Sequence, residues 1–380
     1  MFVDIYAIQT VPPSNINRDD TGSPKTAIYG GVRRARVSSQ AWKRAMRESF
    51  SEYLPEGSLG VRTKLAAELL ADSISKKRSD LADRAPELAA AVLRVLGLEV
   101  EKSRRSGDDE GKQSTSYLVF IARHELAELA DIAIGWADDG KDLKKLSKKS
   151  KPEAKEAKRA FSGSQAVDVA LFGRMLADVP ELNTDASSQV AHAISVDKVT
   201  QEFDYFTAID DCASDDNAGA AMINTVDFNS STLYRYATVN VDALFDQLED
   251  ADATSRGVAA FAEAFVRSMP TGKQNTFANR TLPNYVLVAL RDKQPINAVS
   301  AFEEPVQADD GTSVSRRAAK RLGDRIKGLE DAYDMKSLDS WYVSEGGDVD
   351  ELGVIASRVT LAELIKNVQS AVVASCSSGE

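Results

Sequence analysis

The chain has 380 residues, 43% of them hydrophobic, and a formal net charge of −11, so we expect a folded protein of two or three modules. No apolar run approaches the length of a membrane span and the first residues lack a secretion signal, so we expect a cytoplasmic protein that binds no membrane. The two cysteines exclude a disulfide framework, and the sequence lacks zinc-ligand spacings, nucleotide-binding glycine loops and the G-x-S-x-G turn, so we expect no metal and no cofactor.

The first predicted element is a strand over residues 2–9, FVDIYAIQ, in which apolar and β-branched residues alternate. Prolines, asparagines and glycines then predict a loop over residues 10–37. A helix is expected to begin at Ser38 or Ser39, because either side chain can cap it. Its apolar residues recur at helical spacing and predict one buried stripe, formed by Trp42, Ala45, Met46, Ser49, Phe50 and Tyr53.

The composition changes between residues 59 and 186, where alanine and leucine dominate. Helical periodicity recurs there in four segments, at 61–75, 80–97, 116–137 and 164–178. Two polar stretches interrupt these segments, at 101–114 and 141–159. We therefore expect a helical insertion into a domain that contains β-strands.

Strands return after the insertion. The elements predicted there are strands at 187–196 and 231–241, a hairpin between them at about 197–226, a helix at 254–269, a strand at 284–292, and helices at 314–335 and 359–373. Without the insertion and the hairpin, the order is strand, helix, strand, strand, helix, strand. This is the ferredoxin-like order that RRM domains share, so we expect an α+β fold.

A short basic stretch stands out in this acidic chain. Residues 25–47 hold seven basic residues and no acidic one: Lys25, Arg33, Arg34, Arg36, Lys43, Arg44 and Arg47. A solvated helix face, pairing with acids elsewhere in the chain and an import signal are all compatible with such a stretch. Anion binding is favoured because the Gly30-Gly31 pair permits close approach to a phosphate and a helix N-terminus follows at Ser38. A track of this length suits the backbone of a nucleic acid.

Six motifs make the sequence similar to a known family. They are NRDD at 17–20, AIYGGVRRARVSSQAWKRAMR at 27–47, VDVALFGRM at 167–175, AHAIS at 191–195, FTAIDD at 206–211 and YRYATVNV at 234–241. In this order they resemble the CasC family, the backbone subunits of type I-E CRISPR Cascade complexes in the RAMP superfamily. The resemblance covers residues 1 to about 280.

The resemblance implies a fold described as a right hand. Residues 1–58 and 187–380 would form an RRM-like palm, the insertion 59–186 would form helical fingers, and the hairpin at about 197–226 would form a thumb. Several copies would stack along one crRNA, together with a large subunit, a small subunit and two RAMP end subunits. Pairing between the guide and target DNA would read the sequence, so the protein would need only to recognise backbone and shape.

The resemblance also implies roles for individual residues. The family's crRNA contacts match Arg18, Lys25, Ser38, Gln40, Lys43, Arg44 and Arg47, to which the basic stretch adds Arg33, Arg34 and Arg36. The base-displacing wedges match Met175, Phe206 and Ile209, and further RNA-binding candidates are Arg174 and Lys273. A lysine-rich surface for target DNA matches Lys144, Lys145, Lys148, Lys149 and Lys151. Phe206 and Met175 are alternatively core residues, and the lysines alternatively a solvated helix face.

A second function remains open on the sequence. Some RAMP relatives cut RNA, and Asp19 and Asp20 lie in a loop near the predicted RNA track, where they could bind a metal ion. No second carboxylate is placed to complete such a site, and both residues could instead order the neighbouring arginines. We therefore expect a non-catalytic protein, with a metal-dependent ribonuclease as the alternative.

Overall fold

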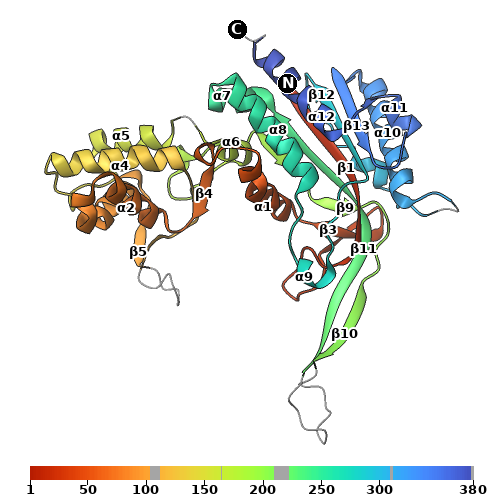
Figure 1. Cartoon of the computed structure of the whole chain (residues 1–380), viewed down its shortest axis with the longest axis horizontal. Helices are drawn as coiled ribbons and strands as arrows, with labels where there is room; N and C mark the ends of the chain where they lie inside the picture. The colour runs from red at the N-terminus through yellow and green to blue at the C-terminus, as the bar shows by residue number, and fades with distance from the viewer. Residues whose placement is uncertain (103–111, 164, 209–221, 309–310, 378–380) are drawn as a thin grey trace, which may run out of the picture. The chain divides into compact units, whose positions relative to one another are not determined.

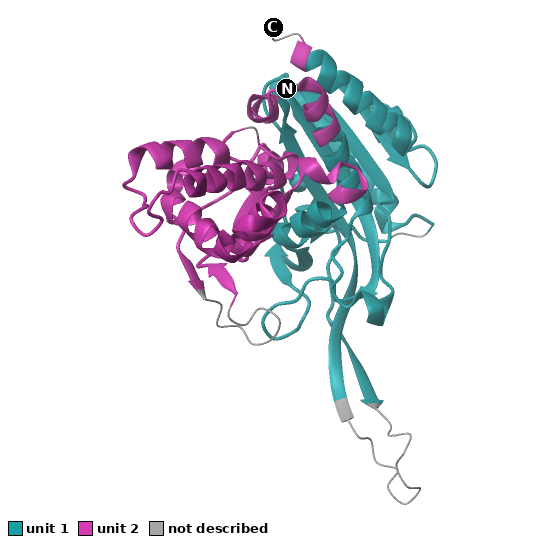
Figure 2. Ribbon diagram, turned by 60° about the vertical axis from the view of Figure 1, so that its left-hand side comes forward, with its two compact units in different colours: residues 1–49, 189–241, 258–375 teal, residues 50–188, 242–257, 376–380 magenta. Residues whose placement is uncertain are grey.

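The computed structural model describes residues 1–102, 112–163, 165–208, 222–308 and 311–377. Within them the chain forms two compact units, coloured separately in Figure 2. Unit 1 consists of residues 1–49, 189–241 and 258–375, and unit 2 of residues 50–188, 242–257 and 376–380. The segment predicted as a helical insertion, 59–186, lies within unit 2.

Unit 1 is built on a large sheet in which most neighbouring strands are antiparallel. Strand β1 (Phe2–Ser14) lies between β12 (Tyr285–Arg291) and β11 (Met222–Asn240), with Ile5 opposite Val288 on one side and Ala237 on the other. The full strand order is β14 (Ser357–Arg358), β13 (Asp339–Ser344), β12, β1, β11, β9 (Ala193–Ser195), β3 (Val32–Val37) and β2 (Thr26–Tyr29). The chain therefore has the mixed α+β composition that the sequence predicts.

Helices cover the two faces of this sheet. Ile8 of β1 packs with Leu322 of α10 (Val314–Tyr333), whereas Val11 of the same strand packs with Trp42 of α1 (Ser39–Ser49). Side chains at even and odd positions of a strand point to opposite faces, so α1 and α10 flank the sheet on opposite sides (Figure 1). The stripe predicted for the first helix is confirmed at Trp42 and Met46, which are both buried.

The loop predicted over residues 10–37 is wrong for most of its length. Strand β1 continues to Ser14, and β2 and β3 form a hairpin within the same segment. Proline is tolerated at positions 12 and 13 because β12 pairs with β1 only as far as Ile8, so the far end of β1 has one unpaired edge. The two glycines that indicated a loop form the turn of the hairpin.

Other boundaries in unit 1 also differ from the prediction. The strand predicted at 187–196 is interrupted at Ala191 and His192, between β8 (Ser188–Val190) and β9. Strand β11 is 19 residues long and joins the predicted hairpin to the strand predicted at 231–241. The helix predicted at 254–269 corresponds to α8 (Ala251–Arg267), and those at 314–335 and 359–373 correspond to α10 and α12 (Leu361–Ser377). Elements of unit 1 that were not predicted include β13, α11 (Asp350–Gly353) and β14, and the helix α7 (Val241–Leu248), which was also not predicted, belongs to unit 2 from Asp242 onward.

Unit 2 is mainly helical. Its helices between residues 50 and 188 are α2 (Ala66–Lys77), α3 (Ala85–Leu96), α4 (Arg123–Asp138), α5 (Lys151–Phe161) and α6 (Val167–Phe172), the first four around one apolar core. Two short strand pairs accompany them, β4 (Gly60–Thr63) with β7 (Val119–Ala122) and β5 (Val100–Lys102) with β6 (Gln113–Thr115). The helix predicted at 164–178 ends at Phe172, because Gly173 adopts a φ of 78°. No helix among the described residues is long and apolar enough to span a membrane.

Candidate nucleic-acid interface

The hairpin of β2 and β3 carries the first arginines of the basic stretch. Gly30 and Gly31 form its two-residue turn with φ values of 60° and 75°, which glycine adopts at no steric cost. Gly30 also lies directly against unit 1's backbone, since an added Cβ would be 1.6 Å from the carbonyl oxygen of Glu303. This docking fixes β3, from which Arg33 projects into solvent.

Arg34 is buried and is not an RNA contact, which corrects the prediction. Its guanidinium donates to five backbone carbonyl groups, those of Tyr29, Ser195, Val196, Phe302 and Glu303. Alternation along β3 turns Arg34 inward while Arg33 points outward. Arg34 therefore fastens the β2–β3 hairpin to the rest of unit 1.

Helix α1 presents the main part of the basic stretch. Ser38 precedes the helix, and its side chain accepts a hydrogen bond from the backbone N–H of Ala41 (3.4 Å). With Trp42 and Met46 buried, the opposite face carries the predicted polar residues, which are Gln40, Lys43, Arg44 and Arg47. Gln40 and Arg44 are exposed, Lys43 and Arg47 are half-buried, and burial lowers the pKa of Lys43.

One charge on this face is partly compensated. Arg44 forms an ion pair with Glu48 one turn along α1 (2.7 Å). The hydrogen bond to the Glu48 carboxylate, and then its charge, raise the pKa of Arg44. An incoming phosphate must compete with Glu48 for the Arg44 guanidinium.

A buried arginine that the sequence reasoning missed lies beneath α1. The guanidinium of Arg235 on β11 stacks on the ring of Trp42 (3.6 Å to its centre) and lies 4.4 Å from the centre of the Phe265 ring. It donates to the side chain of Gln9 (2.6 Å) and to the carbonyl of Phe265. Burial lowers the pKa of Arg235 to about 9. Its position inside the strand motif YRYATVNV was the available signal, because a charged residue among buried strand residues needs specific partners.

The loop before β2 is ordered by its own polar residues. The Asn17 side chain accepts from the backbone N–H of Ser38 (2.9 Å), and its carbonyl accepts from the N–H of Lys25 (2.9 Å). One carboxylate oxygen of Asp19 accepts from the backbone and hydroxyl of Thr21 and from the N–H of Ser23. These hydrogen bonds, the one from the Thr21 hydroxyl most of all, lower the pKa of Asp19. Asp19 therefore organises the turn.

Two of the predicted RNA contacts flank this loop. Arg18 is exposed and forms an isolated β-bridge with Pro24, and Lys25 is half-buried. The carbonyl of Lys25 accepts from the backbone N–H of Arg36 (2.9 Å), which joins the loop to β3. The Nη1 atom of Arg36 lies 3.3 Å from Nδ1 of His192, a residue for which the sequence reasoning gave only a structural role. The candidate cations of unit 1 therefore follow one another from the loop through β3 to α1.

The predicted thumb contains an antiparallel hairpin of β10 (Glu202–Ala208) and β11, which projects from the sheet (Figure 1). Phe206 is 37% exposed, and on the other face of β10 Phe203 and Tyr205 are 67% and 63% exposed. Phe206 is therefore not a core residue. Ile209 lies outside the described residues. Lys273 is half-buried, with a φ of 53°, directly before the short helix α9 (Gln274–Phe277).

In unit 2 the structure separates two neighbouring predicted contacts. Arg174 is buried, pairs with Glu125 (2.8 Å), and lies 4.1 Å from the centre of the Phe161 ring, so the prediction that it contacts RNA is wrong. Its guanidinium also donates to the carbonyls of Phe120, Phe161 and Leu182. Met175, the next residue, is 81% exposed and is available to a ligand.

The five lysines predicted to contact target DNA lie mostly in the segment before α5, and they do not form one face of a helix. Lys144, Lys145, Lys148 and Lys149 are exposed in an irregular segment that the buried side chains of Leu143 and Leu146 anchor, and Lys151 begins α5. Two of the lysines have acidic neighbours. Lys145 pairs with Asp142 (3.1 Å) and Lys148 lies 3.8 Å from Glu181.

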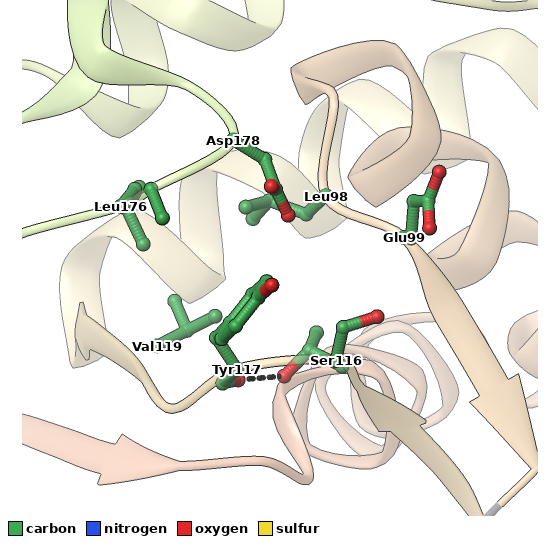
Figure 3. A pocket seen from close by; sticks show the side chains of 9 residues that line it. Leu98, Glu99, Ser116, Tyr117, Val119, Leu176 and Asp178 are labelled. Carbon is green, nitrogen blue, oxygen red and sulfur yellow. Dashed lines mark hydrogen bonds between the residues drawn. The ribbon is translucent and has the colours of Figure 1, made fainter.

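Unit 2 also contains a small pocket (Figure 3). Leu98, Val119 and Leu176 line it, with Tyr117 and Asp178 beside them. The Thr115 hydroxyl donates to the carbonyl of Tyr117 (2.6 Å). None of the described lining residues is basic, so this pocket does not extend the positively charged surfaces.

Comparison with known proteins covers nearly the whole chain. A family model described as "CT1975-like protein" matches residues 3–367. A solved chain described as "CRISPR RNA-guided surveillance complex, pre-nicking" is 35% identical with a TM-score of 0.82, over 98% of this chain and 100% of that chain. Another, described as "CRISPR RNA-guided surveillance complex", is 29% identical with a TM-score of 0.61, over 98% and 99% of the two chains. A search of curated proteins finds no match.

Proposed function

The chain belongs to the CT1975-like protein family, and from this premise we propose that it is a crRNA-binding backbone subunit of a type I-E CRISPR Cascade complex. The family and both structural matches confirm the resemblance to the CasC family. The observation that carries the proposal is the series of exposed and half-exposed cations in unit 1, from Arg18 through Arg36 to Arg47. It lies in an acidic chain whose full length matches subunits of RNA-guided complexes.

The chemistry of this surface suits an RNA backbone of any sequence. Guanidinium and ammonium groups recognise phosphate oxygens, and the N-terminus of α1 adds oriented N–H groups and a positive dipole. Sequence is then read by pairing between the guide and target DNA. The proposed protein partners are further copies of this chain, the large and small subunits and two RAMP end subunits, in the cytoplasm.

We propose that the palm is RRM-like. The four central strands pair in the order β12, β1, β11, β9, with the first strand of the chain inside. This order, with the two inner strands antiparallel, is the one expected of a ferredoxin-like arrangement. Helix α1, which follows β3, and α8, which precedes β12, take the places of the two helices in that arrangement.

The same proposal assigns roles to the β10–β11 hairpin and to the exposed residues of unit 2. Phe206 and Met175 would stack against displaced bases of the guide, and the lysines before α5 would contact target DNA. We propose no catalytic role. Asp19 supports this, because its carboxylate is engaged by Thr21 and Ser23 within the turn.

The test is RNA binding by a triple variant in which Lys43, Arg44 and Arg47 are changed to Ala. Fluorescence anisotropy with two labelled single-stranded RNAs of unrelated sequence, at several salt concentrations, measures affinity. We expect similar losses for both RNAs and a salt dependence that is shallower by about 0.7 per lost contact. The matched control changes the exposed Lys327, Lys336 and Lys366 of unit 1 to Ala. Losses that depend on RNA sequence, or an unchanged salt slope, contradict the proposal.

A further inference from the structure

His192 occupies a position on the basic surface that no part of the proposed function uses. It lies in the interruption between β8 and β9, in unit 1, and its ring is exposed. Its Nδ1 atom is 3.3 Å from Nη1 of Arg36, whose Nε donates to the carbonyl of Thr26 (3.3 Å). An exposed imidazole is thus held against a cation that is itself anchored to β2.

This contact fixes where the imidazole carries its proton. A guanidinium has donors and no acceptor, so in a hydrogen bond with Arg36 the Nδ1 atom of His192 must accept. The proton of the neutral ring is then on Nε2, at the opposite side of the ring from Arg36. In the part of the chain that the structure describes, Arg36 is the one hydrogen-bond partner of this ring. The Nε2–H group therefore has its donor capacity left for a ligand.

The surroundings of the ring favour an anion as that ligand. Burial first, then the charges of Arg36 and Lys25, lower the pKa of His192, which keeps the ring neutral near pH 7. These two cations are the charged groups that act on it, one from β3 and one from the loop before β2, and no described carboxylate offsets them. Both are among the residues whose proposed ligand is phosphate.

We propose that His192 binds the RNA backbone, donating its Nε2–H to a phosphate oxygen while Arg36 fixes its tautomer. The inference rests on the proposed function, because it names a further contact for the same RNA. It makes a neutral histidine a hydrogen-bond donor to the guide, in a place where Lys25 and Arg36 supply the charge.

Substitution provides the first test, with a labelled single-stranded RNA of mixed sequence as the probe and the full chain as the protein. We expect His192→Ala to weaken binding about three- to tenfold, within the range for an ordinary net hydrogen bond at an exposed position. His192→Gln keeps an N–H donor near the position of Nε2 and should remain within about twofold of the unaltered protein. The control is His124→Ala, which changes the other histidine, on α4 in unit 2. Unchanged affinity for His192→Ala overturns the inference.

Nuclear magnetic resonance measures the tautomer and the pKa of His192, and RNA would not change this pKa if His192 had a purely structural role. The chain has two histidines, so the ¹⁵N-histidine spectrum contains signals from two rings, and His124→Gln assigns them. We expect the Nε2–H tautomer for His192 in the free protein, and a rise in its pKa when RNA binds, because a phosphate stabilises the protonated ring. The signals of the His124 ring should not move when RNA is added. An Nδ1–H tautomer, or a His192 pKa that RNA leaves unchanged, contradicts the inference.

The two proposals fail in distinguishable ways. If the unaltered protein does not bind RNA at all, the proposed function fails. If Lys25→Ala weakens RNA binding and His192→Ala does not, the RNA-binding surface stands and the role of His192 alone is excluded.

Discussion

The arginines of this chain differ chiefly in what accepts their N–H groups. Arg34 donates to carbonyls, Arg174 to a carboxylate and carbonyls, and Arg235 to an amide and a carbonyl while stacking on aromatic rings. All three are buried. A buried guanidinium needs such partners because an unpaired buried charge costs several kcal/mol, about 3–5 when one partner of a pair is removed. Only arginines that are not enclosed in this way, whether exposed or half-buried, are then available to a phosphate.

Arg174 gives a direct test of this distinction. We expect Arg174→Met to lower the free energy of unfolding by about 3–5 kcal/mol, because it leaves the Glu125 carboxylate buried without its partner. Met175→Ala, at the exposed neighbour, should change it by less than about 0.5 kcal/mol. Urea denaturation of the full chain, without RNA, measures both.

A double variant provides the control for Arg174. Changing Arg174 to Met and Glu125 to Leu together removes both charges, so it should be less destabilising than Arg174→Met alone. If Arg174→Met leaves stability unchanged and weakens RNA binding, Arg174 acts as an RNA contact and the structural role is wrong.

Strand β11 belongs to two parts of the fold, the central sheet and the projecting hairpin. Its C-terminal part pairs with β1 inside the sheet, from Ser231 to Asn240, and its N-terminal part pairs with β10 in the projecting hairpin. An isolated two-stranded hairpin is marginally stable in water, so continuity with a central strand of the sheet supports it. Hydrogen bonds at its base add to this, since the Asp227 carboxylate accepts from Gln201 (2.6 Å) and from Ser23.

Phe206 on this hairpin tests the wedge that we propose. We expect Phe206→Ala to leave the melting temperature nearly unchanged, because Phe206 is 37% exposed and lies on the β10–β11 hairpin, outside the apolar core of unit 1. It should weaken guide binding or target capture by about 1–3 kcal/mol per displaced base, the value of base–aromatic stacking. Thermal unfolding and target-binding assays on the assembled complex measure the two effects.

The matched control for Phe206 lies on the same strand. Phe203→Ala removes an exposed aromatic ring from the opposite face of β10 and should affect target capture less. If the Phe206→Ala variant unfolds at ordinary temperature, Phe206 is part of the core. If Phe206→Ala and Phe203→Ala weaken target capture equally, Phe206 has no specific role as a wedge.

At the scale of the whole molecule, under the proposed function a chain of this size would cover only a short length of guide. Repeated binding along one RNA then requires contacts between copies that are heterologous, with different patches of each copy meeting head to tail. Such contacts do not close on themselves. The length of the assembly would therefore be set by the RNA and by subunits that occupy its ends.

We expect assembly to depend on guide RNA in this way. Mass photometry of the chain with crRNA and the other subunits should show several copies per complex, and a longer guide should add copies. The triple variant of Lys43, Arg44 and Arg47 should reduce the number of copies bound at a given concentration. A complex that holds one copy whatever the length of the guide excludes open-ended stacking.

The sequence predicted those parts of the fold that depend on local patterns. Period-two and period-3.6 recurrence of apolar residues located β1, α1, β12 and α10, and the capping residue Ser38 located the start of α1. The loop predicted at 10–37 was wrong because prolines and glycines mark a chain reversal without showing whether strands flank it. Pairing between β3 and β9 is a contact between distant segments, and local composition carries no signal for it.

For the candidate site, the sequence by itself determined which residues are basic and that they gather between residues 18 and 47. Only the tertiary structure decided which of them face solvent. Arg33 and Arg34 are adjacent and chemically identical, yet one is exposed and the other is enclosed by carbonyls from segments 161 to 269 residues away. The contact between Arg36 and His192 likewise joins residues 156 positions apart. Charge is a property of a residue and can be read from its letter, whereas burial and hydrogen-bond partners are properties of packing between distant segments.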